Sequence, residues 1–274
     1  MYVSSDLSYL WERRKDKPFI STIFSKNKMP TPKLKIKNKI TKTFPKILHC
    51  PADEPDKEWN ELCNYFTKKE WNVFLPEEVS IITFNNREKK CLEKNLDSIG
   101  LNYHVLGKEI KLWSNTNKIR LLSEFLPNIK TKYVLVMDAD DVLVVRELSN
   151  LINEFEEYYC EILFNASNFF YPETEDGFYK KKEDEIVNDF FNHLNSGCFL
   201  GKTVFVSELY NMASSYQDEV TKKYHYSDQI IIKKFYVDLF PKIKIDHKCN
   251  IFQIFHSSKP LSDFIEISTS IKLL

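Results

Sequence analysis

The sequence predicts an α/β protein with a mainly parallel, mixed sheet whose two faces are covered by helices. Short apolar runs typical of buried strands alternate with amphipathic helical segments along most of the chain. The central run KYVLVMD leads directly into three carboxylates, and open α/β sheets bind their ligands at the carboxyl ends of strands. With 274 residues and 43% hydrophobic content, the chain can bury one large core.

The alternation begins after Pro76. The run VSIITF (79–84) predicts a strand, REKKCLEKNLDSIG (87–100) a helix that ends at Gly100, and NYHVLG (102–107) a second strand. The pattern continues with a helix, a strand, a helix and a strand, expected at 118–125, 132–138, 147–158 and 161–166. Strands separated by helices favour parallel pairing, because a parallel crossover needs a long connection.

The first part of the chain has a different character. Residues 1–75 are expected to form a basic arm and a helical extension, and residues 76–274 the main domain. The run KMPTPKLKIKNKITKTFPK is rich in lysine with little apolar periodicity, which predicts an extended, solvated arm. The segment DKEWNELCNYF (56–66) places its apolar residues on one helical face and predicts a helix that leans on the main domain.

Composition narrows the function classes. Basic and acidic residues both number 39, so the formal net charge is zero and nothing steers the surface toward nucleic acid or anionic lipid. We expect no membrane span and no signal peptide, and the six dispersed cysteines predict reduced thiols, so the chain as written is expected in the cytoplasm. The sequence contains no glycine-rich dinucleotide fingerprint or P-loop, and it does not indicate an oligomeric state.

The strongest chemical signal is the carboxylate cluster Asp138, Asp140 and Asp141. Close carboxylates repel one another unless a cation neutralises them, and oxygen ligands suit Mg²⁺ or Mn²⁺, which often complete their shell with phosphate oxygens. A solvated turn or a helix cap would also place acids after a strand. A phosphohydrolase with Asp138 as nucleophile and Asp140 as acid/base is a further alternative, although that class carries its motif earlier in the domain.

Several segments, in this order, resemble the glycosyltransferase region of procollagen lysyl hydroxylases and related collagen glucosyltransferases. They are VSIITFNN, NYHVLGKEIKLW, NKIRLLSEFL, YVLVMDADDVLV, FYP, HLNSGCFLG, SDQIIIKKFY and IDHKCNIFQ. The resemblance implies a Rossmann-like GT-A fold, Mn²⁺, and a UDP-sugar donor, with UDP-glucose foremost. It also implies transfer to hydroxylysine or galactosyl-hydroxylysine of a collagen-like protein, in relatives that reside in the lumen of the endoplasmic reticulum.

The resemblance also assigns residues to the donor. The family's metal carboxylates fall on Asp138 and Asp141, and the residue that faces the nucleoside falls on Asp140, where the usual aromatic is missing. The first strand end, expected to contact uridine or merely to form a turn, carries Thr83, Phe84 and Asn85. Two residues are expected to approach the diphosphate, namely Trp113 and Lys118.

A second group is expected around the transferred sugar. The turn Asn195, Ser196 and Gly197 would let the sugar lie close to the backbone, although a simple tight turn has the same composition. Asp228 and Gln229 open an apolar helix, and we expect them, with Asn195, to be catalytic or to bind sugar rather than only to cap the helix. Tyr171 lies where a ring could stack on sugar or acceptor.

The family's third metal ligand is a histidine in an H-G-x-G-x-x-K segment beyond the strand that contains Gln253. This chain lacks that motif there. The segment HSSKP offers His256 as a shortened equivalent ligand and Lys259 as a donor-binding cation, with His247 as second choice for the metal. The missing closing segment leaves an inactive nucleotide-sugar-binding relative as the competing hypothesis.

Overall fold

The computed structural model describes residues 33–51, 57–68, 71–173, 177–216, 227–255 and 259–270. His256 and the arm before residue 33 therefore lie outside the described residues. The domain division at residue 75 stays a prediction.

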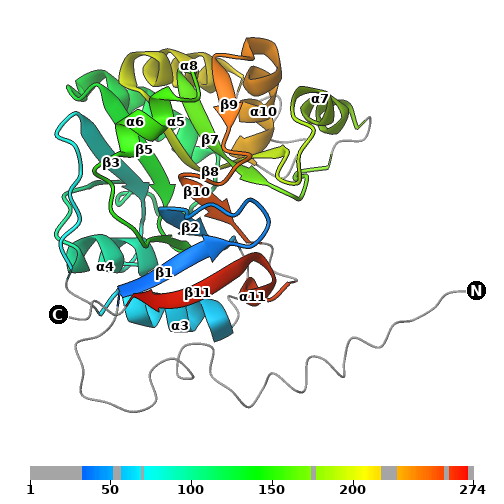
Figure 1. Ribbon diagram of the computed structural model, residues 1–274. Helices are drawn as coiled ribbons and strands as arrows, with labels where there is room; N and C mark the ends of the chain where they lie inside the picture. Colours follow the sequence, from blue (N-terminus) through cyan, green and yellow to red (C-terminus); the bar gives the residue numbers. More distant parts are fainter. Residues whose placement is uncertain are drawn as a thin grey trace, which may run out of the picture.

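A six-stranded sheet forms the centre of the fold (Figure 1). Its spatial order is β4 (His104–Leu106), β3 (Val79–Phe84), β5 (Tyr133–Asp138), β8 (His193–Lys202), β7 (Ile162–Ser167) and β9 (Ile243–Ile245). Strand β3 runs parallel to β4 and β5, and β7 runs parallel to β9, whereas β8 is antiparallel to both of its neighbours. The predicted α/β class with a mixed sheet is confirmed, and the arrangement is compatible with a GT-A, Rossmann-like fold.

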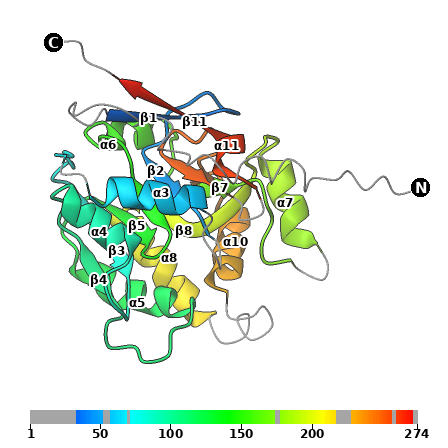
Figure 2. The same ribbon diagram turned by 90° about the horizontal axis from the view of Figure 1, so that it is seen from below.

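Helices cover both faces of this sheet, as Figures 1 and 2 show. They are α4 (Cys91–Ser98), α5 (Asn117–Phe125), η1 (Leu126–Asn128), α6 (Leu151–Glu156), α7 (Phe178–Ile186), α8 (Thr203–Ser215) and α10 (Asp228–Leu239). Along β5, Val134 and Val136 join the core built with α5 and α8, while Leu135 and Met137 join the core built with α4 and α6. Because both faces are covered, the residues of β5 that point to either face are apolar, and the run from Tyr133 to Met137 is uninterrupted.

A second, three-stranded sheet lies at the carboxyl end of β5. Its order is β10 (Phe252–Ile254), β2 (Ile47–His49) and β6 (Val142–Val144), with β2 parallel to β10 and antiparallel to β6. The buried Asp246 carboxylate accepts hydrogen bonds from the backbone N–H groups of Ile251 at 2.7 Å and Phe252 at 2.8 Å. This bonding fixes the turn that brings β10 beside β2, so the aspartate of the DHKC segment has a structural role.

A two-stranded ribbon occupies part of the expected arm. Strand β1 (Lys33–Asn38) pairs antiparallel with β11 (Ile265–Ser270), next to α3 (Lys57–Phe66) and α11 (Leu261–Phe264). Leu34 and Ile36 are buried and Lys35 between them is exposed, which is the alternation of a half-buried strand. The expectation of an unpacked arm is therefore wrong for Lys33–Asn38, because the lysines of this segment obscured its two-residue period.

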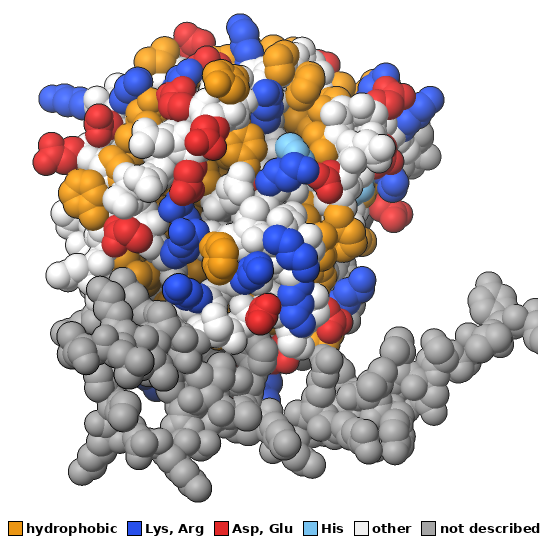
Figure 3. Space-filling model, viewed as in Figure 1, with side chains coloured by type: hydrophobic (Ala, Val, Ile, Leu, Met, Phe, Trp, Pro, Cys, Tyr) orange, Lys and Arg blue, Asp and Glu red, His pale blue; other side chains and the backbone are white. Residues whose placement is uncertain are grey.

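The surface shown in Figure 3 intersperses basic and acidic side chains, in line with the zero formal charge. Within the described part of the chain, the helices are too short or too polar to cross a lipid bilayer.

Candidate metal centre

Three side chains converge where β5 meets the small sheet. Asp138 is the last residue of β5, Asp141 directly precedes β6, and His49 is the last residue of β2. One ligand atom from each lies within 4.8 Å of the others, and His49 Nε2 is 3.4 Å from Asp141 Oδ2. The His49 side chain is 2% exposed and each of the two carboxylates is 22% exposed, so the cluster is accessible from solvent through its carboxylates.

The residues present fit a divalent cation. His49 Nε2 and Asp141 Oδ1 are buried and have no hydrogen-bond partner among the described residues, which is costly unless another group satisfies them. A Cβ atom added at Gly197 would lie 2.4 Å from His49 Cε1 and 2.8 Å from Asp138 Oδ2, so only glycine fits beside the cluster. One imidazole nitrogen with carboxylate oxygens suits a transition ion such as Mn²⁺ better than Mg²⁺, which prefers oxygen alone.

Asn165 on β7 lies behind the histidine. Its amide nitrogen is 3.2 Å from His49 Nδ1, and its Oδ1 is buried without a partner among the described residues. A half-turn of the amide would exchange these atoms, so that Nδ1–H donates to Oδ1 and Nε2 keeps its lone pair for a metal. Asn165 can therefore set the tautomer that metal binding requires.

Lys118 on α5 neutralises the cluster from the other side. Its Nζ lies 2.6 Å from Asp138 Oδ1. Burial lowers the pKa of Lys118, but the charges of Asp138 and Asp228 outweigh burial and raise it above its ordinary value. Burial raises the pKa of Asp138 despite Lys118, whereas at Asp141 the effect of burial is outweighed by His49 and Lys118, so the Asp141 pKa is lowered.

Asp140 is separate from the three ligands. Its side chain is 55% exposed, 3.2 Å from Arg87 Nη2 and 3.9 Å from Lys90 Nζ. It thus joins the aspartate loop to the segment that follows β3, the strand whose end carries the residues expected to contact uridine.

The residues at the end of β3 have mixed surroundings. Thr83 is fully buried and its hydroxyl has no partner among the described residues. Asn85 accepts a hydrogen bond from the Arg87 N–H at 2.9 Å and donates to Glu93, which fixes the turn into α4. Phe84 lies 6.4 Å from the ring of Trp113, measured between centroids, and 6.0 Å from Lys118 Nζ. The structure therefore brings Phe84, Trp113 and Lys118 together beside Asp138.

The predicted sugar-side residues form one hydrogen-bonded group. Gln229 Oε1 accepts from Asn195 Nδ2 at 3.2 Å and from the Ser196 N–H at 3.1 Å, and Gln229 Nε2 donates to the Tyr171 carbonyl. Asp228 is the first residue of α10, with Ser227 at the cap position, and its charge acts on Lys118. Gln229 thus ties the turn at residues 195–196 to α10 and to the loop of Tyr171, whose ring is half exposed.

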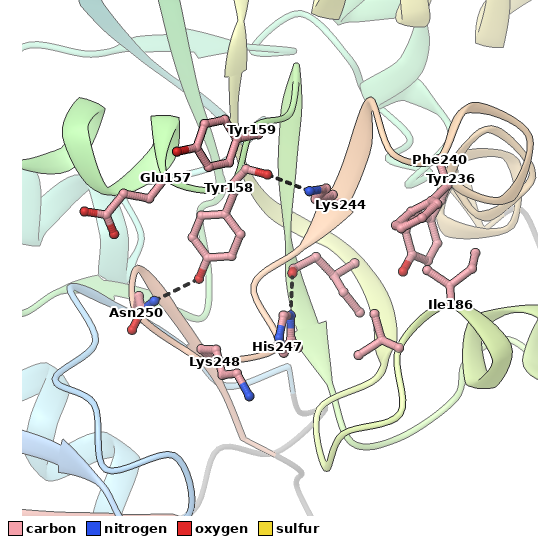
Figure 4. Close-up of a pocket in the computed structure, with 12 residues that line it drawn as sticks. Glu157, Tyr158, Tyr159, Ile186, Tyr236, Phe240, Lys244, His247, Lys248 and Asn250 are labelled. Atoms are coloured by element: carbon pink, nitrogen blue, oxygen red, sulfur yellow. Dashed lines mark hydrogen bonds between the residues drawn. The ribbon is translucent and has the colours of Figure 1, made fainter.

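His247, the second choice as ligand, lies elsewhere. It lines a hollow of about 410 Å³ beside edge strand β9, with Tyr158, Tyr236 and Lys248 (Figure 4). None of the residues predicted for the donor, the sugar or the metal lines this hollow, apart from His247 itself. Lys259 is exposed just before α11.

The sequence did not point to His49. It lies in the region expected to be an arm, far along the chain from Asp138. The sequence contained one weak signal, since the apolar pair Ile47 and Leu48 directly precedes His49, as the apolar run of β5 directly precedes Asp138.

Comparisons with known proteins agree on one family. The family model described as PLOD GT domain matches residues 77–268, which is more than half of the chain. Procollagen-lysine,2-oxoglutarate 5-dioxygenase of Drosophila melanogaster is 22% identical over 213 residues, covering 75% of this chain and 27% of the relative. Procollagen-lysine,2-oxoglutarate 5-dioxygenase 1 of Homo sapiens is 27% identical over 143 residues, covering 50% and 18%. The corresponding Bos taurus protein is 26% identical over 174 residues, covering 61% and 22%. The chain spans about a quarter or less of these relatives.

Proposed function

The chain belongs to the PLOD GT domain family, and from this premise we propose that it transfers a hexose, glucose foremost, from a UDP-sugar to hydroxylysine or galactosyl-hydroxylysine of a collagen-like protein. The observation that carries the proposal is the cluster of His49, Asp138 and Asp141 at the end of the central strand. Family membership favours sugar transfer over the phosphohydrolase alternative.

In this proposal, His49, Asp138 and Asp141 hold Mn²⁺. The bound ion would supply positive charge that stabilises the diphosphate as it leaves the sugar. Lys118 lies 2.6 Å from Asp138 and serves as a second, fixed cation for the same diphosphate.

The remaining donor contacts come from two sides. The nucleoside lies against the segment of Thr83, Phe84 and Asn85, near Trp113, with Asp140 and Arg87 at the exposed rim. The sugar lies against the turn of Asn195 and Ser196, next to Gly197, whose missing side chain leaves room for His49 and Asp138.

The acceptor enters beside α10. Asp228 is buried at the first turn of this helix, and its charge contributes to the raised pKa of Lys118, which supports a role close to the metal cluster. We assign Asp228 to the reacting hydroxyl groups, Gln229 and Asn195 to holding the turn against the sugar, and Tyr171 to stacking on sugar or acceptor.

The test compares two neighbouring acids. Asp141→Asn is expected to lower Mn²⁺ affinity and UDP release from UDP-glucose by about 100-fold, because a partly buried, charged ligand is lost. Asp140→Asn is the matched control, and its Mn²⁺ affinity should stay within about threefold of the parent, since this side chain pairs with Arg87. Equal effects of the two substitutions, or full turnover in Asp141→Asn, would contradict the assignment.

A donor and acceptor screen separates the alternatives. UDP-glucose, UDP-galactose and UDP-N-acetylglucosamine are each incubated with Mn²⁺ and a hydroxylysine-containing peptide. An inactive relative would raise its melting temperature with UDP-sugar and release no UDP. A phosphohydrolase would instead cleave a phosphomonoester without any nucleotide.

A further inference from the structure

The segment that supplies His49 lies outside the matched family region, yet it is integral to the fold. The family match begins at residue 77, whereas β1, β2 and α3 span residues 33–66. Strand β2 is the middle strand of its sheet, and Ile47, Leu48 and His49 are all at most 1% exposed. Without β2, strands β10 and β6 would have no common partner.

Helix α3 is equally embedded. Trp59, Leu62 and Phe66 are buried in the same core cluster as strand β5 residue Val136. The Phe66 carbonyl accepts hydrogen bonds from Asn95 Nδ2 at 3.1 Å and from Ser98 Oγ at 2.9 Å. The end of α3 is thereby bound to α4, the helix that directly follows β3 along the chain.

The two ends of the described fold meet. In the antiparallel pair of β1 and β11, Lys33 lies opposite Ser270 and Asn38 lies opposite Ile265. Figures 1 and 2 both show the blue and red strands side by side. The first residue of β1 and the last residue of β11 are therefore placed like the two residues that flank the turn of a β-hairpin.

The path through the fold is thus closed. Starting at β3, it runs through β10, α11 and β11, crosses to β1 as in a hairpin, continues through β2 with His49, and ends at α3 beside α4. We infer that this chain is a circular permutant of its family's glycosyltransferase domain, in which the final segment, β1, β2 and α3, is placed first. Domains whose ends lie close together tolerate such reordering.

The inference explains the missing third ligand. The family resemblance implied a metal-binding histidine beyond the strand of Gln253, with His256 as its equivalent in this chain, and β2, which pairs with that strand, brings His49 to the metal cluster. In the permuted order, the ligand comes from the N-terminal side of the chain. The metal part of this reasoning rests on the proposed function, whereas the order of the strands does not.

The test restores the uninterrupted order. Residues 69–274 are followed directly by residues 1–68, so that the residues after β11 and those before β1 serve as the connection between these two strands and no residue is lost. The reordered protein should give one cooperative unfolding transition within about 10 °C of the parent, and a Mn²⁺ affinity within about threefold of the parent by electron paramagnetic resonance. His49→Ala should weaken Mn²⁺ binding at least about tenfold in both orders. A reordered chain that aggregates or melts without cooperativity overturns the inference.

A second measurement tests whether residues 1–68 are merely an appended extension. Leu48→Asn in the full chain puts a polar side chain into the buried middle strand β2, so it should lower the melting temperature and weaken Mn²⁺ binding in both orders. If this variant unfolds and binds Mn²⁺ like the parent in both orders, residues 1–68 are an appended extension and the inference is overturned. If both orders fold and bind Mn²⁺ but neither releases UDP, the proposed transfer fails and the permutation stands.

Discussion

The glycine beside the metal cluster gives the sharpest test of the geometry. Gly197 lies on β8, where a Cβ atom would be 2.4 Å from His49 Cε1, 2.8 Å from Asp138 Oδ2 and 3.0 Å from His49 Nε2. Its φ angle is not positive, so Gly197→Ala acts through the added methyl group rather than through backbone strain. The methyl group would push apart two of the three ligands that the metal needs together.

The magnitude follows from these distances. Contacts below 3.0 Å force neighbouring atoms to move, and overpacking of this kind costs about 1–3 kcal/mol. For a chain of this size, that loss lowers the melting temperature by about 2–10 °C. Because the displaced atoms belong to the ligands themselves, Mn²⁺ affinity should also fall at least about tenfold.

Gly201→Ala is the matched control on the same strand. A Cβ atom there would meet Val206 Cγ2 at 2.6 Å, Ile162 Cγ1 at 3.0 Å and the Glu161 carbonyl at 3.2 Å, all away from the metal cluster. Its melting temperature should fall by a similar amount while Mn²⁺ affinity stays unchanged. Calorimetric unfolding and Mn²⁺ titration of both variants supply the comparison. If Gly197→Ala kept the parent's Mn²⁺ affinity, His49 and Asp138 could not be ligands of one ion.

Three further predictions concern buried polar groups. Asn165→Leu should lower Mn²⁺ affinity about tenfold, because the His49 ring loses the partner of its Nδ1 atom. Asn165→Asp should keep the parent's Mn²⁺ affinity, because a carboxylate also accepts a hydrogen bond from Nδ1–H. Equal affinities in the two variants would exclude an orienting role for Asn165. Lys118→Met leaves Asp138 unpaired, which should lower the free energy of unfolding by about 3–5 kcal/mol in the absence of metal. Mn²⁺ should therefore raise the melting temperature of this variant more than that of the parent or of the control Lys90→Met. The same Mn²⁺-induced rise in all three proteins would refute this reasoning. Tyr236→Phe should stabilise the protein by about 1–3 kcal/mol, because the buried hydroxyl has no partner among the described residues. Burial raises the Tyr236 pKa, so the folded protein keeps this proton when the unfolded chain loses it above a pH of about 10; the parent's stability should therefore fall above that pH, less steeply in Tyr236→Phe, and identical pH profiles would speak against it.

Much of the central sheet was predictable because apolar runs carry a strong signal. Strands β3 and β5 are covered by helices on both faces, so burial favoured apolar residues at most positions, with Ser80, Thr83 and Asp138 as the exceptions. Pairing is a different matter, since periodicity identifies a strand and not its neighbours. The insertion of antiparallel β8 between β5 and β7 therefore could not be derived from the strand pattern alone.

The candidate site was predictable only in part. Asp138 and Asp141 follow a strong strand signal, and their closeness follows from the chain itself. His49 could not be found in this way, because its place in the cluster depends on β2 pairing with both β10 and β6, and no local pattern encodes those contacts. The two-residue period of β1 was hidden by lysines that point to solvent or lie half buried.

The wide sequence separation of His49 from the two carboxylates has a consequence for assembly. In a partly folded chain, Asp138 and Asp141 alone would bind a cation weakly, because they lie close together in the sequence but provide only two ligands. His49 joins them only when β2 has paired with both β10 and β6. The affinity for the cation therefore reports whether folding is complete, since high affinity arises only when the long-range pairing of β2 has formed. Where the cation is scarce, its supply would govern how much of the polypeptide reaches the mature state.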